Sequence, residues 1–211
     1  MVNLFDEYVM SDPKNSQKYN LIMSAATRIF SEKGYKAASM DEIAAAAPVS
    51  KATLYAHFRD KKNLFTAMIV DRCNNLSQII DQVMVDPNLD FRTGLQKIAH
   101  QFQELTQSQE SMCILSLVVA EKKQFSEIAE IFYTSVNLIT SSLSKYLDVV
   151  AIRKEAYFKC THLAAIMFIN MLKGDYFMKN LLGLPVQKSK QLQQELVDEA
   201  VHLFIQGHLL L

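Results

Sequence analysis

The chain has 211 residues, half of them apolar, which is enough for one large domain or two small ones with a substantial core. Lys plus Arg number 22, as do Asp plus Glu, so the total charge excludes neither a nucleic-acid partner nor an uncharged one. Five Gly and four Pro are few for this length, which disfavours an all-β fold and favours long helices.

Several features indicate the compartment. The three cysteines are an odd number without paired spacing, as in proteins kept reduced. The first ten residues are acidic and lack the basic region of a secretory signal. The longest apolar run, Leu163 to Leu172, is interrupted by Asn170 and is too short to cross a bilayer. We therefore expect a soluble, cytoplasmic protein with no membrane partner.

The chain opens with a leader and a first helix. Residues 1–16 read as a flexible leader, and a helix is predicted from about Ser16 to Lys33. Gly34 stands where a helix often ends in a left-handed conformation. The apolar residues that recur on one face of this helix are Ile22, Ala25, Ala26, Ile29 and Phe30.

Two short helices are predicted next, separated by a tight turn. Ser39 and Glu42 have the spacing of a capping box, which predicts a helix over 40–46. Pro48 lies in the turn, and Ser50 can cap a second helix over 51–58. Two short helices across such a turn form the DNA-reading unit of the helix-turn-helix class. The alternative is an ordinary surface pair of helices.

The second of these helices carries side chains suited to DNA. Leu54 and Phe58 are four residues apart and are expected to pack inward. The remaining positions offer a cation, a hydroxyl, a phenol and an imidazole, which suit phosphate oxygens and base edges. These residues are Lys51, Thr53, Tyr55 and His57.

The charge distribution supports the same interpretation. Residues 17–62 hold eight Lys or Arg and four Asp or Glu, a net charge of +4. Residues 1–16 and 63–211 each carry a net charge of −2. A basic N-terminal module on an acidic body is typical of a DNA reader, although a solvated basic face would look similar.

The order and spacing of residues 22–65 resemble the N-terminal domain of TetR/AcrR-type transcriptional regulators. The resemblance rests on three motifs: Ile22-x-x-Ala25-Ala26-x-x-x-Phe30-x-x-x-Gly34-Tyr35, Ser39-Met40-x-x-Ile43-Ala44, and Val49-Ser50-Lys51-x-Thr53-Leu54-Tyr55-x-His57-Phe58-x-x-Lys61-x-x-Leu64-Phe65. It implies a repressor that reads double-stranded operator DNA. The family usually has Gly where Pro48 stands; because the proline ring holds φ near about −65°, we expect the turn to differ locally.

The predicted DNA contacts fall into three groups. The side chains of Lys51, Tyr55, His57 and Lys61 are expected to reach phosphates. Ser39 and Ser50 are expected to do so through their hydroxyls or through helix N-terminal amides, and Thr53 is expected to reach a base edge. Replacing Lys61 by Ala should then weaken all sequences alike and lower the salt slope by about 1. The full set of expected DNA-binding residues is Ser39, Ser50, Lys51, Thr53, Tyr55, His57 and Lys61.

The rest of the chain also predicts helices. A long one runs over about 61–85 and is stopped by Asp86-Pro87-Asn88. Further helices are expected near 90–107, 111–121, 124–148, 152–182 and 187–209. The predicted fold is all-α with about nine helices. Residues 17–63 would form the helix-turn-helix domain, and 64–211 a helical effector-binding and dimerisation domain.

The last two predicted helices have broad apolar faces, so each needs more than one neighbour. In proteins resembling this one, these helices pair with their symmetry mates, which implies a homodimer. The alternative is that both faces belong to the core of a single chain. The stretch Lys173-Gly174-Asp175-Tyr176-Phe177 with Leu181-Leu182-Gly183 is similar to the C-terminal region of an AefR-like subgroup.

Regulators of this kind sense a small molecule in the C-terminal body. Soft, bulky side chains there suit an apolar or weakly polar ligand, although at any single position ordinary core packing is the favoured interpretation. The candidates are Phe102, Met112, Cys113, Leu117, Phe125, Phe132, Tyr133, Met167 and Phe168.

An enzyme is the competing hypothesis. Glu199 and His202 share a helix face, but a di-metal bundle would need a second such pair, and we find none in the sequence. The sequence has no Gly-rich phosphate loop and no nucleophile elbow. We expect no cofactor, no metal and no catalytic residue. The alternative left open is an all-helical metal- or redox-dependent protein with an incidental helix-turn-helix.

Overall fold

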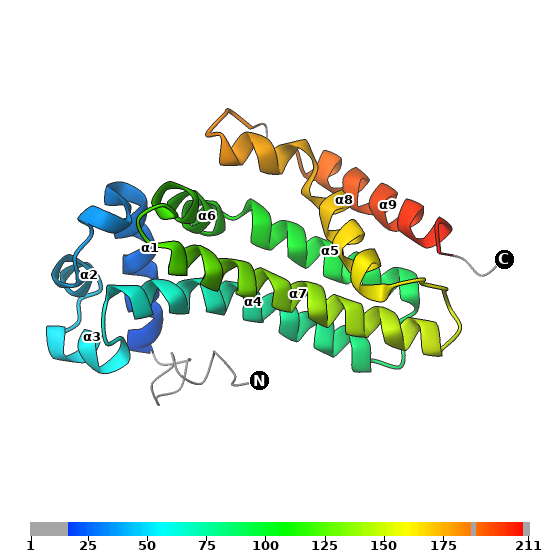
Figure 1. The fold of residues 1–211 in the computed structure, drawn as a ribbon, viewed down its shortest axis with the longest axis horizontal. Helices are drawn as coiled ribbons and strands as arrows, with labels where there is room; N and C mark the ends of the chain where they lie inside the picture. The colour runs from blue at the N-terminus through cyan, green and yellow to red at the C-terminus, as the bar shows by residue number, and fades with distance from the viewer. Residues whose placement is uncertain (1–16, 187–188, 209–211) are drawn as a thin grey trace. The chain divides into compact units, whose positions relative to one another are not determined.

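The computed structural model describes residues 17–186 and 189–208, and these residues form nine helices and no strand (Figure 1). The predicted leader, 1–16, lies outside this range. The described helices do not include one long and apolar enough to cross a membrane. The all-α prediction is confirmed. The helices are α1 (Gln17–Ala37), α2 (Met40–Ala46), α3 (Lys51–His57), α4 (Lys61–Val85), α5 (Phe91–Gln107), α6 (Gln109–Glu121), α7 (Ser126–Ile152), α8 (Thr161–Leu181) and α9 (Lys190–Gln206).

The short helices begin where the sequence predicts. Ser39 and Glu42 form a complete capping box at α2. Ser50 accepts a hydrogen bond from the backbone N–H of Thr53 at α3. The Asp60 carboxylate accepts from the backbone N–H of Asn63 in the first turn of α4, at 2.8 Å. Capping by local side chains therefore defines where these helices begin.

The chain divides into two compact units, and each contains two stretches of sequence. The head unit comprises Met1–Asp71 and Cys113–Thr134, and the body unit comprises Arg72–Met112 and Ser135–Leu211. Helices α4, α6 and α7 contribute residues to both units. Residues from α6 and α7 therefore share the core of the helix-turn-helix, where Ile114, Val118 and Ile128 are buried with Ile43 and Leu54.

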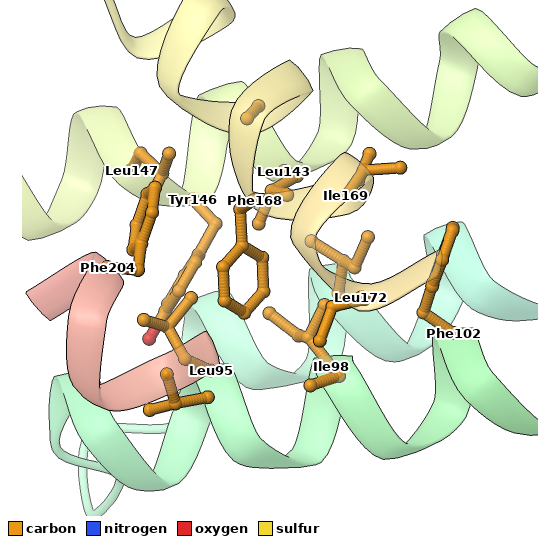
Figure 2. Close-up of a cluster of buried hydrophobic side chains, with 14 of the residues drawn as sticks. Leu95, Ile98, Phe102, Leu143, Tyr146, Leu147, Phe168, Ile169, Leu172 and Phe204 are labelled. Atoms are coloured by element: carbon orange, nitrogen blue, oxygen red, sulfur yellow. The ribbon is translucent and has the colours of Figure 1, made fainter. Parts of the chain in front are cut away.

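In the body unit, α5 packs against both α8 and α9. Figure 2 shows the core at this junction, where side chains from α5, α7, α8 and α9 point toward one another. Phe168 of α8 and Phe204 of α9 have ring centroids 4.8 Å apart. Close packing of large side chains from four helices holds this unit together.

One predicted helix, 152–182, is wrong at its start. α7 continues to Ile152, residues 153–160 are not helical, and α8 begins only at Thr161. Lys154 takes a positive φ of 60°, and the backbone N–H of Glu155 bonds to the carbonyl of Val150. This closes α7 with a left-handed residue that is neither Gly nor Asn, so composition gave no signal for the break.

Candidate nucleic-acid interface

Apolar contacts in the core of the head unit hold the helix-turn-helix in place. α2 packs against both α1 and α3. Ile43 and Ala44 of α2 are buried, as are Leu54 of α3 and Phe58, which directly follows it. The inward packing that the sequence predicts for Leu54 and Phe58 is therefore confirmed. One face of α3 is anchored in the core, and the other is free to meet a partner.

The outward face of α3 combines one phenol, one cation and small side chains. Tyr55 is 48% exposed, so its phenol is accessible to a partner. Lys51, Ala52 and Ala56 are also exposed, and Arg59 is exposed just beyond the helix. Sequence reasoning missed Ala52, Ala56 and Arg59. Ala52 lies three residues before Tyr55 and four before Ala56, a helix spacing that could have identified both alanines, whose methyl groups suit contact with thymine methyls.

The charged groups at the N-terminal end of this face are paired within the chain. The Lys51 ammonium lies 2.6 Å from a carboxylate oxygen of Asp41. The Lys33 ammonium lies 2.5 Å from Glu42, and this bond, with the Ser39 hydroxyl, lowers the pKa of the Glu42 carboxyl. Both pairs are solvent-exposed, so each is weak and a phosphate can replace the carboxylate as the partner of Lys51.

Two of the expected DNA-binding hydroxyls, those of Ser39 and Ser50, serve as helix caps, and a third, that of Thr53, contacts one of them. The Ser39 hydroxyl lies within 3.2 Å of the backbone N–H of Glu42. The Ser50 hydroxyl accepts from the backbone N–H of Thr53 at 3.1 Å and lies 2.9 Å from the Thr53 hydroxyl. The Thr53 side chain is half-buried. These groups give α2 and α3 their starting geometry, and any contact with DNA would be additional.

The imidazole of His57 packs on α1. Its ring centroid is 6.3 Å from that of Tyr19, in an edge-on arrangement. The Tyr19 hydroxyl donates to a carboxylate oxygen of Asp71 at 3.1 Å, and burial raises the pKa of that phenol. His57 therefore links the end of α3 to a buried ring of α1.

Lys61 has a different environment from the one expected for a phosphate contact. Its ammonium donates to the carbonyls of Tyr35, Lys36 and Ala38, at 2.7, 3.1 and 2.8 Å. The nitrogen also lies 4.8 Å from the centre of the Tyr35 ring, and burial lowers its pKa. An ammonium has three donors, so none is left for a phosphate in this arrangement.

The turn between α2 and α3 differs from the expectation for proline. Pro48 has a φ of 23°, far from the value of about −65° that its ring favours. The turn is bridged by a hydrogen bond from the backbone N–H of Val49 to the carbonyl of Ala44, at 3.2 Å. The expected negative φ is therefore wrong: the turn keeps a positive φ, and Pro48 is strained.

The nine candidate effector-binding residues do not gather in one place. Leu117, Phe125 and Phe132 pack against the core of the head unit. Tyr133 is 68% exposed and Met167 52%. In the body unit, Phe102 and Phe168 are part of the packed core in Figure 2. Met112 of the body unit is buried, and Cys113 of the head unit is partly buried, with its sulfur 2.8 Å from the Ser31 hydroxyl.

The body unit holds a pocket of about 170 Å³ between α4 and α5. It is lined by Arg72, Asn75, Leu76 and Ile79 from α4 and by Gln101, Glu104 and Leu105 from α5. None of the nine candidates lines it. On each helix the lining residues are spaced three or four apart and so share one face, but sequence periodicity alone does not show that these two faces meet.

Metal and thiol chemistry have little support. Within residues 17–186 and 189–208, His, Cys, Asp and Glu form no group of three or more that could hold a metal ion. Burial raises the pKa of the Cys73 thiol to about 12 and also raises that of Cys113. Neither is a thiolate near neutral pH, which argues against these two as redox sensors.

A capped helix-turn-helix with an exposed tyrosine and lysine, followed by a helical body, defines a DNA-binding transcriptional regulator. Comparison with known families agrees. The family described as "Bacterial regulatory proteins, tetR family" matches residues 22–68. The "AefR-like transcriptional repressor, C-terminal domain" matches residues 93–207, more than half of the chain. The chain belongs to the TetR family of regulators, which are not enzymes, and its C-terminal region is AefR-like.

Individual proteins show the same similarity. The HTH-type transcriptional regulator YhgD of Bacillus subtilis is 36% identical over 77 residues, which cover 36% of this chain and 40% of YhgD. The matched region is thus less than two thirds of that relative. A TetR-family regulator from Mesorhizobium loti superposes with a TM-score of 0.79 at 24% identity, over 94% of this chain and 100% of its own. The flavonoid-responsive regulator FrrA gives a TM-score of 0.69 at 26% identity, over 92% and 97%.

Proposed function

We propose that this protein is a ligand-responsive repressor that binds a palindromic operator as a homodimer and is released by a small, mostly apolar effector. The observation that carries the proposal is the exposed Tyr55 and Lys51 on a helix anchored by buried Leu54. Residues 17–63 form the DNA-binding domain in this proposal, and 64–211 the effector-binding and dimerisation domain.

The contacts with DNA divide by chemistry. Lys51 exchanges Asp41 for a phosphate, and Tyr55 donates its phenol to a phosphate. Thr53 and Ala52 face base edges, where their methyl groups meet thymine methyls. Ser39, Ser50 and His57 support contact with the DNA backbone, because they fix the ends of α2 and α3. Lys61 contributes by holding the end of α1 and adds a phosphate contact only if DNA displaces its carbonyl partners.

The proposed dimer uses α8 and α9. Six large apolar side chains remain exposed on the described residues of these helices in the single chain, namely Leu163, Ile166, Met167, Met178, Leu192 and Leu203. Exposed apolar residues in such number on two packed helices are typical of an interface. A dimer would place two α3 helices on successive major grooves, about 34–36 Å apart.

Release of the protein from DNA follows from a difference in effector affinity between two conformations of the body unit. An effector that binds the body shape in which the two α3 helices no longer match this spacing shifts the population away from DNA. FrrA is described as flavonoid-responsive, which supports a small organic effector for this chain too.

The test begins with selection of duplexes from a randomised library by the purified protein. Binding of the selected duplex is then measured over a salt series. Lys51→Ala should lower the salt slope by about 1, whereas Lys122→Ala, an exposed lysine in the loop after α6, should leave it unchanged. Thr53→Ala should change the selected sequence. Failure to enrich any sequence, or equal slopes for both lysine variants, would contradict the proposal.

The dimer is tested by sedimentation equilibrium. The double variant Leu163→Glu/Leu203→Glu should sediment as a monomer and lose operator affinity. Val85→Glu, at a residue 72% exposed at the end of α4, is the matched control and should remain dimeric. A native protein that sediments as a monomer while binding a palindrome tightly would exclude this interface.

A further inference from the structure

One carboxylate of α2 lies against the lysine that is proposed to bind a phosphate. A carboxylate oxygen of Asp41 lies 2.6 Å from the Lys51 ammonium, and the two side chains are 57% and 66% exposed. Asp41 stands in the first turn of α2, and Lys51 is the first residue of α3. The pair therefore joins the two helices of the helix-turn-helix within the head unit, on a surface that is open to solvent.

The start of α2 is capped without Asp41. Ser39 is the N-cap, and the Glu42 carboxylate completes the capping box by accepting from the backbone N–H of Ser39 at 3.1 Å. Glu42 also pairs with Lys33. Among the described residues, the ion-pair partner of the Asp41 carboxylate is Lys51. Its charge adds a small favourable interaction with the helix dipole, so the main effect of Asp41 is on Lys51.

A carboxylate in this position opposes DNA binding. If the Lys51 ammonium turns fully to a phosphate, Asp41 loses its counter-charge on a surface that faces a polyanion. If the ammonium stays between the two groups, two anions share one cation. In either arrangement the phosphate is bound less tightly than it would be by a lysine without a carboxylate beside it.

We propose that Asp41 is a positioning residue that lowers the affinity of this protein for duplex DNA by holding the Lys51 ammonium. The inference rests on the proposed function and adds to it a residue that acts against binding. Because the contact involves a phosphate and no base, operator and unrelated duplexes are weakened by the same factor. The strength of an exposed ion pair corresponds to a factor of up to about five in an equilibrium constant.

A moderate affinity suits a regulator that has to leave its operator. An effector typically changes the affinity of a second site by about 5–150-fold. A duplex held much more tightly than this range can offset stays bound when the effector is present. By weakening a sequence-independent contact, Asp41 lowers the affinity toward that range while the base contacts of α3 keep their preference.

The affinity of the full chain for duplex DNA tests this role. Fluorescence anisotropy measures binding of the selected duplex and of a scrambled duplex by the native protein and by Asp41→Asn. The variant should bind both duplexes about two- to fivefold more tightly, and the gain should shrink at high salt, where exposed charges are screened. Asp41→Glu keeps the carboxylate and should bind as the native protein does. Glu32→Gln removes the same charge from an exposed site on α1 and, as the matched control, should leave binding unchanged.

A double variant shows whether Asp41 acts through Lys51. In Lys51→Met the ammonium is absent, so the addition of Asp41→Asn should no longer tighten binding. An equal gain with and without Lys51 would show that the carboxylate repels the phosphates directly and would overturn the positioning role. Asp41→Ser is a second neutral variant and should show the same gain as Asp41→Asn. Unchanged or weaker binding by both neutral variants would overturn the inference.

The inference and the proposed function fail in different ways. A native protein that selects a duplex and loses affinity in Lys51→Met, but gains none in Asp41→Asn or Asp41→Ser, would refute the role of Asp41 and leave the proposed repressor function intact. A native protein that binds no duplex would refute both.

Discussion

Replacing Lys61 separates a structural role from a DNA contact. In Lys61→Met the apolar stem remains, but the carbonyls of Tyr35, Lys36 and Ala38 lose their shared donor. A hydrogen bond from a charged group contributes about 1.5–3 kcal/mol, and these carbonyls can partly turn to water. We expect a loss of about 2 kcal/mol in the free energy of unfolding. For a chain of this size that corresponds to a melting temperature lower by about 4–8 °C.

The assay pairs thermal unfolding with the salt dependence of duplex binding. Three carbonyls converge on one compact ammonium, and the planar guanidinium of Arg does not fit that arrangement. Lys61→Arg should therefore lower the melting temperature nearly as much as Lys61→Met, although it keeps the charge. The salt slope should stay unchanged in both variants. Lys62→Met is the control, since Lys62 makes only an exposed ion pair with Glu127 at 3.2 Å.

The opposite pattern would refute this reasoning. A melting temperature unchanged in Lys61→Met, with a salt slope lower by about 1 and restored by Lys61→Arg, would show that the ammonium leaves the carbonyls for a phosphate. That is the result predicted from the sequence alone, so one set of variants decides between the two.

Three further changes test the local geometry. Pro48→Gly should raise the melting temperature by about 2–4 °C, because relief of a strained φ of 23° outweighs the larger unfolded-state entropy of Gly. Pro87→Gly is the control and should not raise the melting temperature, since Pro87 has no positive φ. The native protein should be more stable than Glu42→Gln near neutral pH, and this difference should disappear in acid. The pKa of the Glu42 carboxyl is lowered in the folded state, so the stability it gives is lost as the pH falls through that folded-state pKa. A difference in stability that does not depend on pH would contradict this. Gly94→Ala should lower the free energy of unfolding by about 1–3 kcal/mol, because a Cβ would collide with the Tyr146 hydroxyl and come within 3.0 Å of Val83. In chemical unfolding, adding Tyr146→Phe to this variant should restore part of the lost stability.

The helices of the head unit could be predicted from the sequence because the residues that define their ends lie close together in the chain. Ser39, Ser50 and Asp60 cap helices within three residues of themselves, and each cap is present. The inward positions of Leu54 and Phe58 follow from helix periodicity. Where a boundary depended on backbone conformation without a compositional signal, as at Lys154, the same reasoning failed.

The effector region could not be read in this way. Phe102 and Phe168 have the soft, bulky character of a ligand pocket, yet they are buried in a packed core. The pocket between α4 and α5 is lined partly by polar residues, among them Asn75, Gln101 and Glu104, which a search for apolar character passes over. Periodicity identifies which residues are buried but does not say which helix they pack against.

Because periodicity does not show which helices pack together, the sequence also gives an incomplete account of how the two units are connected. In the division predicted from the sequence, at residues 63 and 64, only the helix predicted over about 61–85 extends into both domains. The compact units show that α4, α6 and α7 all contribute to both, since Ile114, Val118 and Ile128 share the head core with Ile43. In α4, Arg72 of the pocket directly follows Asp71, which accepts the hydrogen bond from Tyr19. Since three continuous helices contribute to both units, we expect a change of body conformation to act on the head through more than α4 alone.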